Sequence, residues 1–132
     1  MIFETALYNY LSTYSGLAAL ISIRIYPLIL PQTPTYPAVV WQQISGPRVH
    51  AMGDDPGITS PRYQFTCYGA THADAVAVAK QVRLAFENYS GTMGGTGGVT
   101  VYHAEVENQL SQYNDAVKVF CSIVDVIIWH EE

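Results

Sequence analysis

The feature that most constrains the fold is a strand-like segment followed directly by a helix-like one, between Ser60 and Ser90. Tyr63, Phe65 and Cys67 alternate with polar residues over 61–69, which is the pattern of a β-strand with two different faces. The segment 71–89 instead has apolar residues at helical spacing: Ala75, Val78, Ala79, Val82, Ala85, Phe86 and Tyr89. We therefore predict a central strand of a sheet and, after it, the helix that covers that sheet.

The ends of this helix are also marked in the sequence. Thr71 is placed as the N-cap, and Asp74 follows within the first turn, where the helix dipole favours a negative charge. Gly91 is placed to end the helix, because glycine adopts the left-handed backbone conformation that commonly follows a C-terminus.

The remainder of the chain predicts an α+β fold in a single domain over residues 1–132. Helices are expected at 2–14 and 17–21, and further strands at 23–26, 38–45, 99–107 and 117–129. Four prolines make 27–37 an extended connection. Segments 48–59 and 90–98, the latter with five glycines, read as flexible loops, and 109–115 as a polar turn. The expected fold is a mainly antiparallel sheet of four to five strands with helices on one face, in the order α-β-β-β-α-β-β.

Composition narrows the classes of function. Charged residues make up 13% of the chain, roughly half the usual fraction, and there are ten tyrosines. A chain with few charges and many tyrosines is suited to burying its surface against partner proteins, because tyrosine packs against both apolar and polar neighbours. The net charge is −5 with no basic cluster, so sequence-independent binding to nucleic acid lacks its main source of energy. We expect a soluble protein without a signal peptide or a membrane partner.

His103, Glu105 and Glu107 alternate along one predicted strand and would project on one side of it. A histidine and two carboxylates can bind a divalent metal, although such a site usually needs ligands from other elements. The alternative is the solvated face of a strand. We predict no metal, cofactor or catalytic residue.

Three other patterns favour structural explanations. The glycine-rich segment 91–98 leads from a helix into a strand and has no lysine, unlike a phosphate-binding loop. Cys67, with His72 or His103 and with Asp125, would make a thiol triad only if Cys67 were activated, and a cysteine in the middle of a strand is not. Cys67 and Cys121 are expected to be two buried, reduced thiols, with a disulfide between them as the alternative. Asp125 lies within an apolar strand and needs a partner, for which an arginine of this or a neighbouring subunit is the natural candidate.

The order of these segments resembles the tail-completion or tail-terminator (head–tail joining) proteins of long-tailed phages and prophages. The resemblance covers nearly the whole chain. It starts with the opening helix and Ile25-Tyr26-Pro27, and continues with the proline-rich connection and Tyr36-Pro37-Ala38-Val39-Val40. It then follows the strand Arg62–Gly69, the helix 75–86 and the last long strand 117–129. The family has no catalytic residue to transfer to this sequence.

The resemblance implies a structural protein that forms a ring, a homo-hexamer, capping the tail tube and joining it to the head-side connector or stopper protein. It implies a virion protein, present in the host cytoplasm during assembly. DNA would pass through the lumen without specific binding, and the carboxylates of Asp54, Asp55, Glu105 and Glu107 are the candidates to line it. Two alternatives remain at this stage: a small metal-dependent enzyme using His103 and Glu105, and a monomeric binding module.

Overall fold

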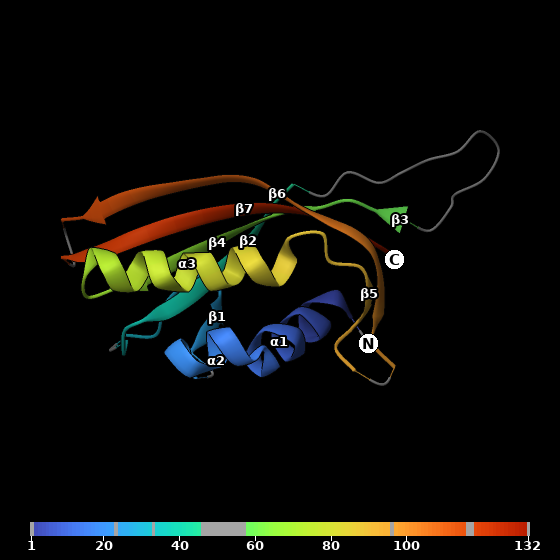
Figure 1. Cartoon of the computed structure of the whole chain (residues 1–132), viewed down its shortest axis with the longest axis horizontal. Helices are drawn as coiled ribbons and strands as arrows, with labels where there is room; N and C mark the ends of the chain where they lie inside the picture. Colours follow the sequence, from blue (N-terminus) through green and yellow to red (C-terminus); the bar gives the residue numbers. More distant parts are fainter. Residues whose placement is uncertain are drawn as a thin grey trace.

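The structure, a computed structural model, describes residues 2–22, 24–32, 34–45, 58–95, 97–115 and 118–131. Three helices and seven strands follow one another along the chain (Figure 1): α1 (Phe3–Thr13), α2 (Ser15–Ile21), β1 (Ile25–Pro27), β2 (Ala38–Ser45), β3 (Ile58–Thr59), β4 (Arg62–Gly69), α3 (His72–Phe86), β5 (Gly91–Met93), β6 (Val99–Asn114) and β7 (Val119–Glu131). The predicted α+β class and element order are confirmed, with the short strands β3 and β5 added.

The strands form one seven-stranded sheet in the order β1-β2-β4-β7-β6-β5, with β3 paired to the end of β7. All strand pairs are antiparallel except β1 with β2. β4 lies between β2 and β7, so the segment predicted as the central strand is central.

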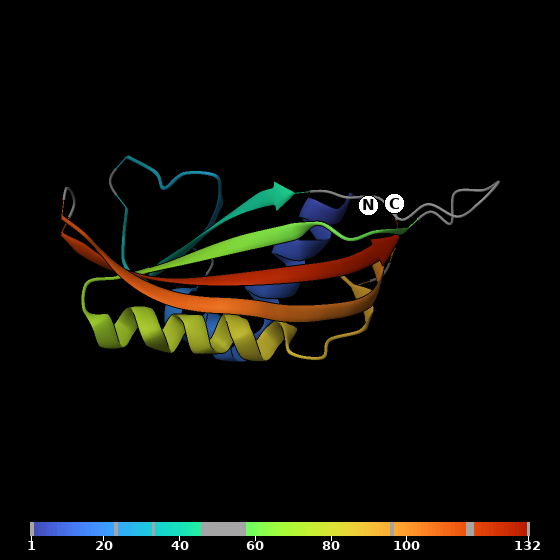
Figure 2. The same ribbon diagram turned by 90° about the horizontal axis from the view of Figure 1, so that it is seen from above.

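The helices pack on one face of this sheet, as expected. Figure 1 shows the three helices together on one side of β6 and β7, and in Figure 2 α3 runs alongside the long strands while α1 passes behind them. The buried stripe of α3 contacts the buried side chains of β4, and the Phe65 and Phe86 rings lie 5.1 Å apart. Phe3 of α1 stacks on His130 of β7, with ring centroids 3.9 Å apart. The core therefore lies between a single helical layer and a single sheet.

The start of α3 agrees with the prediction, whereas its end does not. The Thr71 side chain accepts a hydrogen bond from the Asp74 backbone N–H at 3.2 Å. The helix ends at Phe86, and Asn88 rather than Gly91 takes up the left-handed conformation, with φ of 57°. Asparagine tolerates that conformation almost as well as glycine does, so the chain turns earlier.

The glycine-rich segment is not the irregular loop that was predicted. Gly91–Met93 form β5, which pairs with residues 99–101 of β6, and the Met93 side chain is fully buried. Gly98 lies so close to the backbone of β5 that a Cβ atom there would be 2.0 Å from the Met93 carbonyl oxygen. The glycines thus permit a tight β5–β6 turn anchored by one apolar side chain.

The polar stretch 109–115 is also not the turn that was predicted. β6 continues to Asn114 and pairs with β7 along almost its whole length, with register shifts between Val101 and His103 and between Val106 and Asn108. The polar composition of this stretch did not indicate a strand, because its stability comes from pairing with the apolar strand β7 and not from its own residues. Of the predicted loop 48–59, Ile58 and Thr59 form β3, and the part up to residue 57 lies outside the described residues.

Candidate assembly surface

On the face of the sheet opposite the helices, no helix of the described residues lies over β4, β7 and β6, and we call this face the open face. Side chains of β7 alternate along the strand: Val124, Val126 and Ile128 are fully buried in the core. Their neighbours therefore point to the open face, where they are half-buried. Through the strand register, the open face consists of Arg62, Gln64, Thr66, Tyr68, His103, Glu105, Asn108, Leu110, Gln112, Cys121, Ile123, Asp125, Ile127 and Trp129.

Asp125 is the least satisfied group on the open face. One of its carboxylate oxygens is buried and has no hydrogen-bond partner among the described residues. Its neighbours in register are Gln64 of β4 and Asn108 of β6. Arg62, the nearest arginine by register, lies 3.7 Å from the Glu107 carboxylate instead. Within the described part of the chain, the arginine that we expected beside Asp125 is absent.

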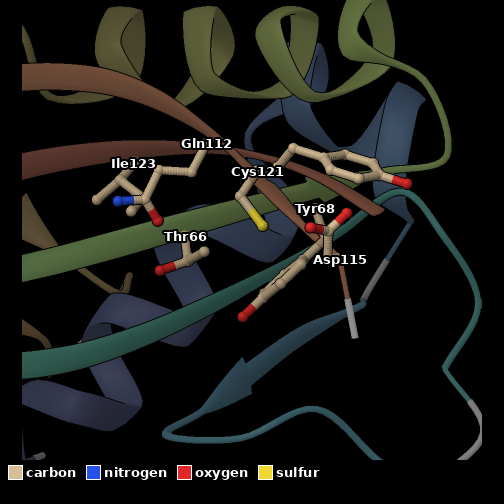
Figure 3. Close-up of a pocket in the computed structure, with 7 residues that line it drawn as sticks. Thr66, Tyr68, Gln112, Asp115, Cys121 and Ile123 are labelled. Carbon is tan, nitrogen blue, oxygen red and sulfur yellow. The ribbon is translucent and has the colours of Figure 1, made fainter. Parts of the chain in front are cut away.

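A hollow of about 530 Å³ lies at the end of the open face near the β6–β7 turn. Figure 3 shows Thr66, Tyr68 and Cys121 from neighbouring strands around the same space, and Ile123, Gln112, Tyr113 and Asp115 complete its lining. Burial raises the pKa of the Cys121 thiol, which disfavours the nucleophilic thiolate. The hollow is therefore suited to contact rather than to catalysis. Sequence reasoning missed it, because β6 was expected to end before Gln112.

The predicted lumen residues divide into two groups. Asp54 and Asp55 lie outside the described residues. Glu105 and Glu107 are exposed on β6, where Glu107 occupies the irregularity between Val106 and Asn108. The lumen position of all four residues stays a prediction.

The structure does not assemble the chemical sites that were considered. His103 lies beside the Trp129 ring, with centroids 5.5 Å apart. Within the described ranges, no group of three His, Cys, Asp or Glu side chains is placed to hold a metal ion. Cys67 faces the core, and Asp125 lies on the other side of the sheet. Burial raises the pKa of the Cys67 thiol, so this cysteine stays protonated.

The outer side of α3 forms a second surface, over which no other described element packs. Ala73, Ala77, Lys80 and Leu84 follow one another at helical spacing opposite the buried stripe, and all four are exposed. We call them the outer stripe. Arg83, next to it, is paired with Glu87 at 3.0 Å. In the described part of the molecule, Lys80 makes no ion pair or hydrogen bond.

The long strand β6 supplies a third feature. β5 pairs only with residues 99–101, so β6 is an edge strand from Tyr102 onward. Every described side chain between Glu107 and Tyr113 is exposed. An edge of this length is normally covered or protected. Here the charges of Glu105 and Glu107 protect one end of the edge. The Asn108 side chain accepts a hydrogen bond from the Gln109 N–H at 2.9 Å, which occupies one backbone donor.

In the described residues no helix has both the length and the apolar character needed to cross a membrane. The model of the family "Tail completion protein gp17" matches residues 5–131. Among solved structures, a chain of the "Virion of native gene transfer agent (GTA) particle" is similar, with a TM-score of 0.65 and 16% identity over 96% of this chain and 92% of that one. This similarity shows a shared fold. No curated protein matches.

Proposed function

Given that the chain belongs to the tail completion protein gp17 family, and is therefore a structural protein of a phage-like tail and not an enzyme, we propose that it forms a hexameric ring that caps the tail tube. The observation that carries this proposal is the match of the family model to residues 5–131, nearly the whole chain. In the proposal, one side of the ring contacts the tail tube protein and the other contacts the head-side connector or stopper. Assembly takes place in the host cytoplasm.

The surface of the molecule supports self-assembly. Two surfaces, the open face and the outer stripe, lie on opposite sides of the same fold, and no helix or strand of the described residues packs over either of them. When a copy offers one surface and its neighbour offers the other, the contact repeats from copy to copy, and a suitable rotation closes it into a ring. The low content of charged residues, 13%, reduces the desolvation cost of such contacts.

The proposed ring lets DNA pass without binding it. Each subunit carries a net charge of −5, so a closed ring has a large negative total. Asp54, Asp55, Glu105 and Glu107 are the proposed lumen residues, and the exposure of Glu105 and Glu107 on the β6 edge supports the last two. Carboxylates around the lumen would repel phosphates and prevent the duplex from adhering during passage.

Electron microscopy of the purified protein, alone and mixed with tail tubes, tests the ring. We expect closed rings, or rings at one end of the tubes. Tubes that stay uncapped at high protein concentration would contradict the proposal. A native mass measurement separates the ring from a monomeric binding module.

A DNA titration at low salt tests the lumen. The wild-type ring should show no micromolar binding, whereas the double variant Glu105→Lys with Glu107→Lys should bind about tenfold more tightly or better, since each added lysine contacts phosphate. The single variants Glu105→Lys and Glu4→Lys change the charge equally, so Glu4→Lys, at an exposed position of α1, is the matched control for the first and should have less effect. Micromolar binding by the wild type, or equal effects of the two single variants, would overturn the lumen assignment.

A further inference from the structure

We infer that neighbouring subunits of the proposed ring pack head to tail, with the outer stripe of α3 from one copy on the open face of the next and Lys80 paired with Asp125 across the contact. This inference rests on the proposed ring and specifies which surfaces build it. The occupant of the open face is thus a second copy of this chain.

The open face has the composition of a surface that becomes covered. Ile123, Ile127 and Trp129 lie along β7 on both sides of Asp125, and all are only half-buried in the single chain. One Asp125 carboxylate oxygen is buried without a hydrogen-bond donor, which destabilises the ionised carboxylate in the single chain. The Asp125 side chain as a whole is only half-buried, so rotation of its carboxylate would turn this oxygen toward a donor of the neighbouring subunit. Exclusion of water would strengthen the resulting ion pair.

The outer stripe has the matching composition. Ala73 and Ala77 have small side chains, so the helix backbone can approach a sheet closely. Leu84 is 42% exposed, which leaves an apolar side chain available for the apolar residues of the open face. Lys80 lies between Ala77 and Leu84 and has no partner in the described part of its own chain.

The charges of the two surfaces are complementary. On and beside the open face, the carboxylates of Glu105, Glu107 and Asp125 are balanced by one described cation, Arg62, which already pairs with Glu107. The outer stripe carries a cation and no carboxylate. Lys118 is the other described lysine without a partner, but it lies in the β6–β7 turn and not on an extended surface.

The same charges argue against a two-fold contact. Two open faces packed on each other would bring carboxylates together, and two outer stripes would bring Lys80 near its own copy. A head-to-tail contact avoids both and is the type that generates rings. A contact centred on Asp125 places Glu105 at its border and leaves the outer edge of β6, with Glu107, free to face the lumen.

A charge exchange tests the pair sharply. Lys80→Glu and Asp125→Lys should each abolish rings or raise the protein concentration needed for them by about tenfold or more, because each leaves like charges across the contact. An equimolar mixture of the two variants should form rings again. In a ring in which the two variants alternate, each contact has opposite charges at positions 80 and 125, either in the wild-type arrangement or with the two charges exchanged. Lys118→Glu makes the same charge change outside the contact and should leave ring formation unchanged.

The outcomes separate the inference from the proposed function. If the wild type and Lys80→Glu form rings at the same concentration, the inference is wrong and the ring stands. If the wild type forms no ring even with tail tubes, the proposed function fails. If Asp125→Lys does not fold, as checked by its circular dichroism, the milder variants Lys80→Gln and Asp125→Asn replace the exchange in a double-mutant cycle. If the double variant forms rings no worse than either single variant, the two residues act as a pair. If the losses in ring formation of the two single variants add up in the double variant, the pair is contradicted.

Discussion

Val82 occupies the middle of the buried stripe of α3 and is fully buried against the sheet. Val82→Asp places a charge without a partner in the core, so we expect a loss of several kcal/mol in the free energy of unfolding. Ala77→Asp, on the exposed side of the same helix, should cost less than about 1 kcal/mol. Urea denaturation of the isolated subunit measures both. An unchanged midpoint for Val82→Asp would show that the wrong side of the helix faces the sheet.

Tyr10 of α1 gives the fold a dependence on alkaline pH. Burial, with smaller contributions from Tyr89 and Tyr14, raises the pKa of Tyr10 from 10.0 to about 12. Its hydroxyl donates a hydrogen bond to the Ala85 carbonyl. Because the unfolded chain releases this proton first, the stabilisation is complete below pH 10 and is lost as pH rises toward 12.

The test for Tyr10 is the slope of unfolding free energy against pH over that alkaline range. Tyr10→Phe should lower stability at neutral pH, because it removes the hydrogen bond, and should make the alkaline decline shallower. Tyr8→Phe, on an exposed position of the same helix, should change neither quantity much. An identical slope in Tyr10→Phe and the wild type would refute this assignment.

At the scale of elements, the sequence predicted those strands and helices in which the spacing of apolar residues itself marks one buried side. The strand Arg62–Gly69 and the stripe from Ala75 to Phe86 were both recognised, because the alternation and the helical spacing follow directly from one buried side. β5 and the second half of β6 were missed, since glycine and polar residues form strands there only through pairing with β6 and β7. The same omission hid the hollow beside Cys121.

The unusual nature of Asp125 was predicted from the sequence, because a carboxylate between apolar residues of a strand requires a partner. The location of that partner was not predictable. Which face Asp125 occupies, and that Arg62 pairs with Glu107 instead, depend on the register of β4, β7 and β6. Nor does the helical periodicity of α3 show that Lys80 and Asp125 lie on opposite sides of the fold.

The β5–β6 turn carries a prediction of its own. In Gly98→Ala the new methyl group would meet the Met93 carbonyl oxygen, which belongs to the backbone and cannot move aside. We expect a clear drop in melting temperature, because β5 must separate from β6 and expose Met93. Gly16→Ala is the control: there the close atom is the end of the flexible Gln81 side chain. Equal melting temperatures of Gly98→Ala and the wild type would contradict the described turn.

At the scale of the whole molecule, low charge and uncovered surfaces point to apolar contacts as the source of assembly energy. With a net charge of −5 on each subunit, the long-range force between copies is repulsive. Salt screens that repulsion over about 10 Å at 0.1 M, and it affects apolar contacts little. A ring held in this way should persist, or become more stable, as salt increases.

Sedimentation velocity across a salt series, at high protein concentration and with and without tail tubes, tests the ring most directly. We predict a discrete ring species whose fraction stays constant or increases with salt, or which appears once tubes are present. A protein that sediments as a monomer at every salt concentration, even with tubes, would contradict it.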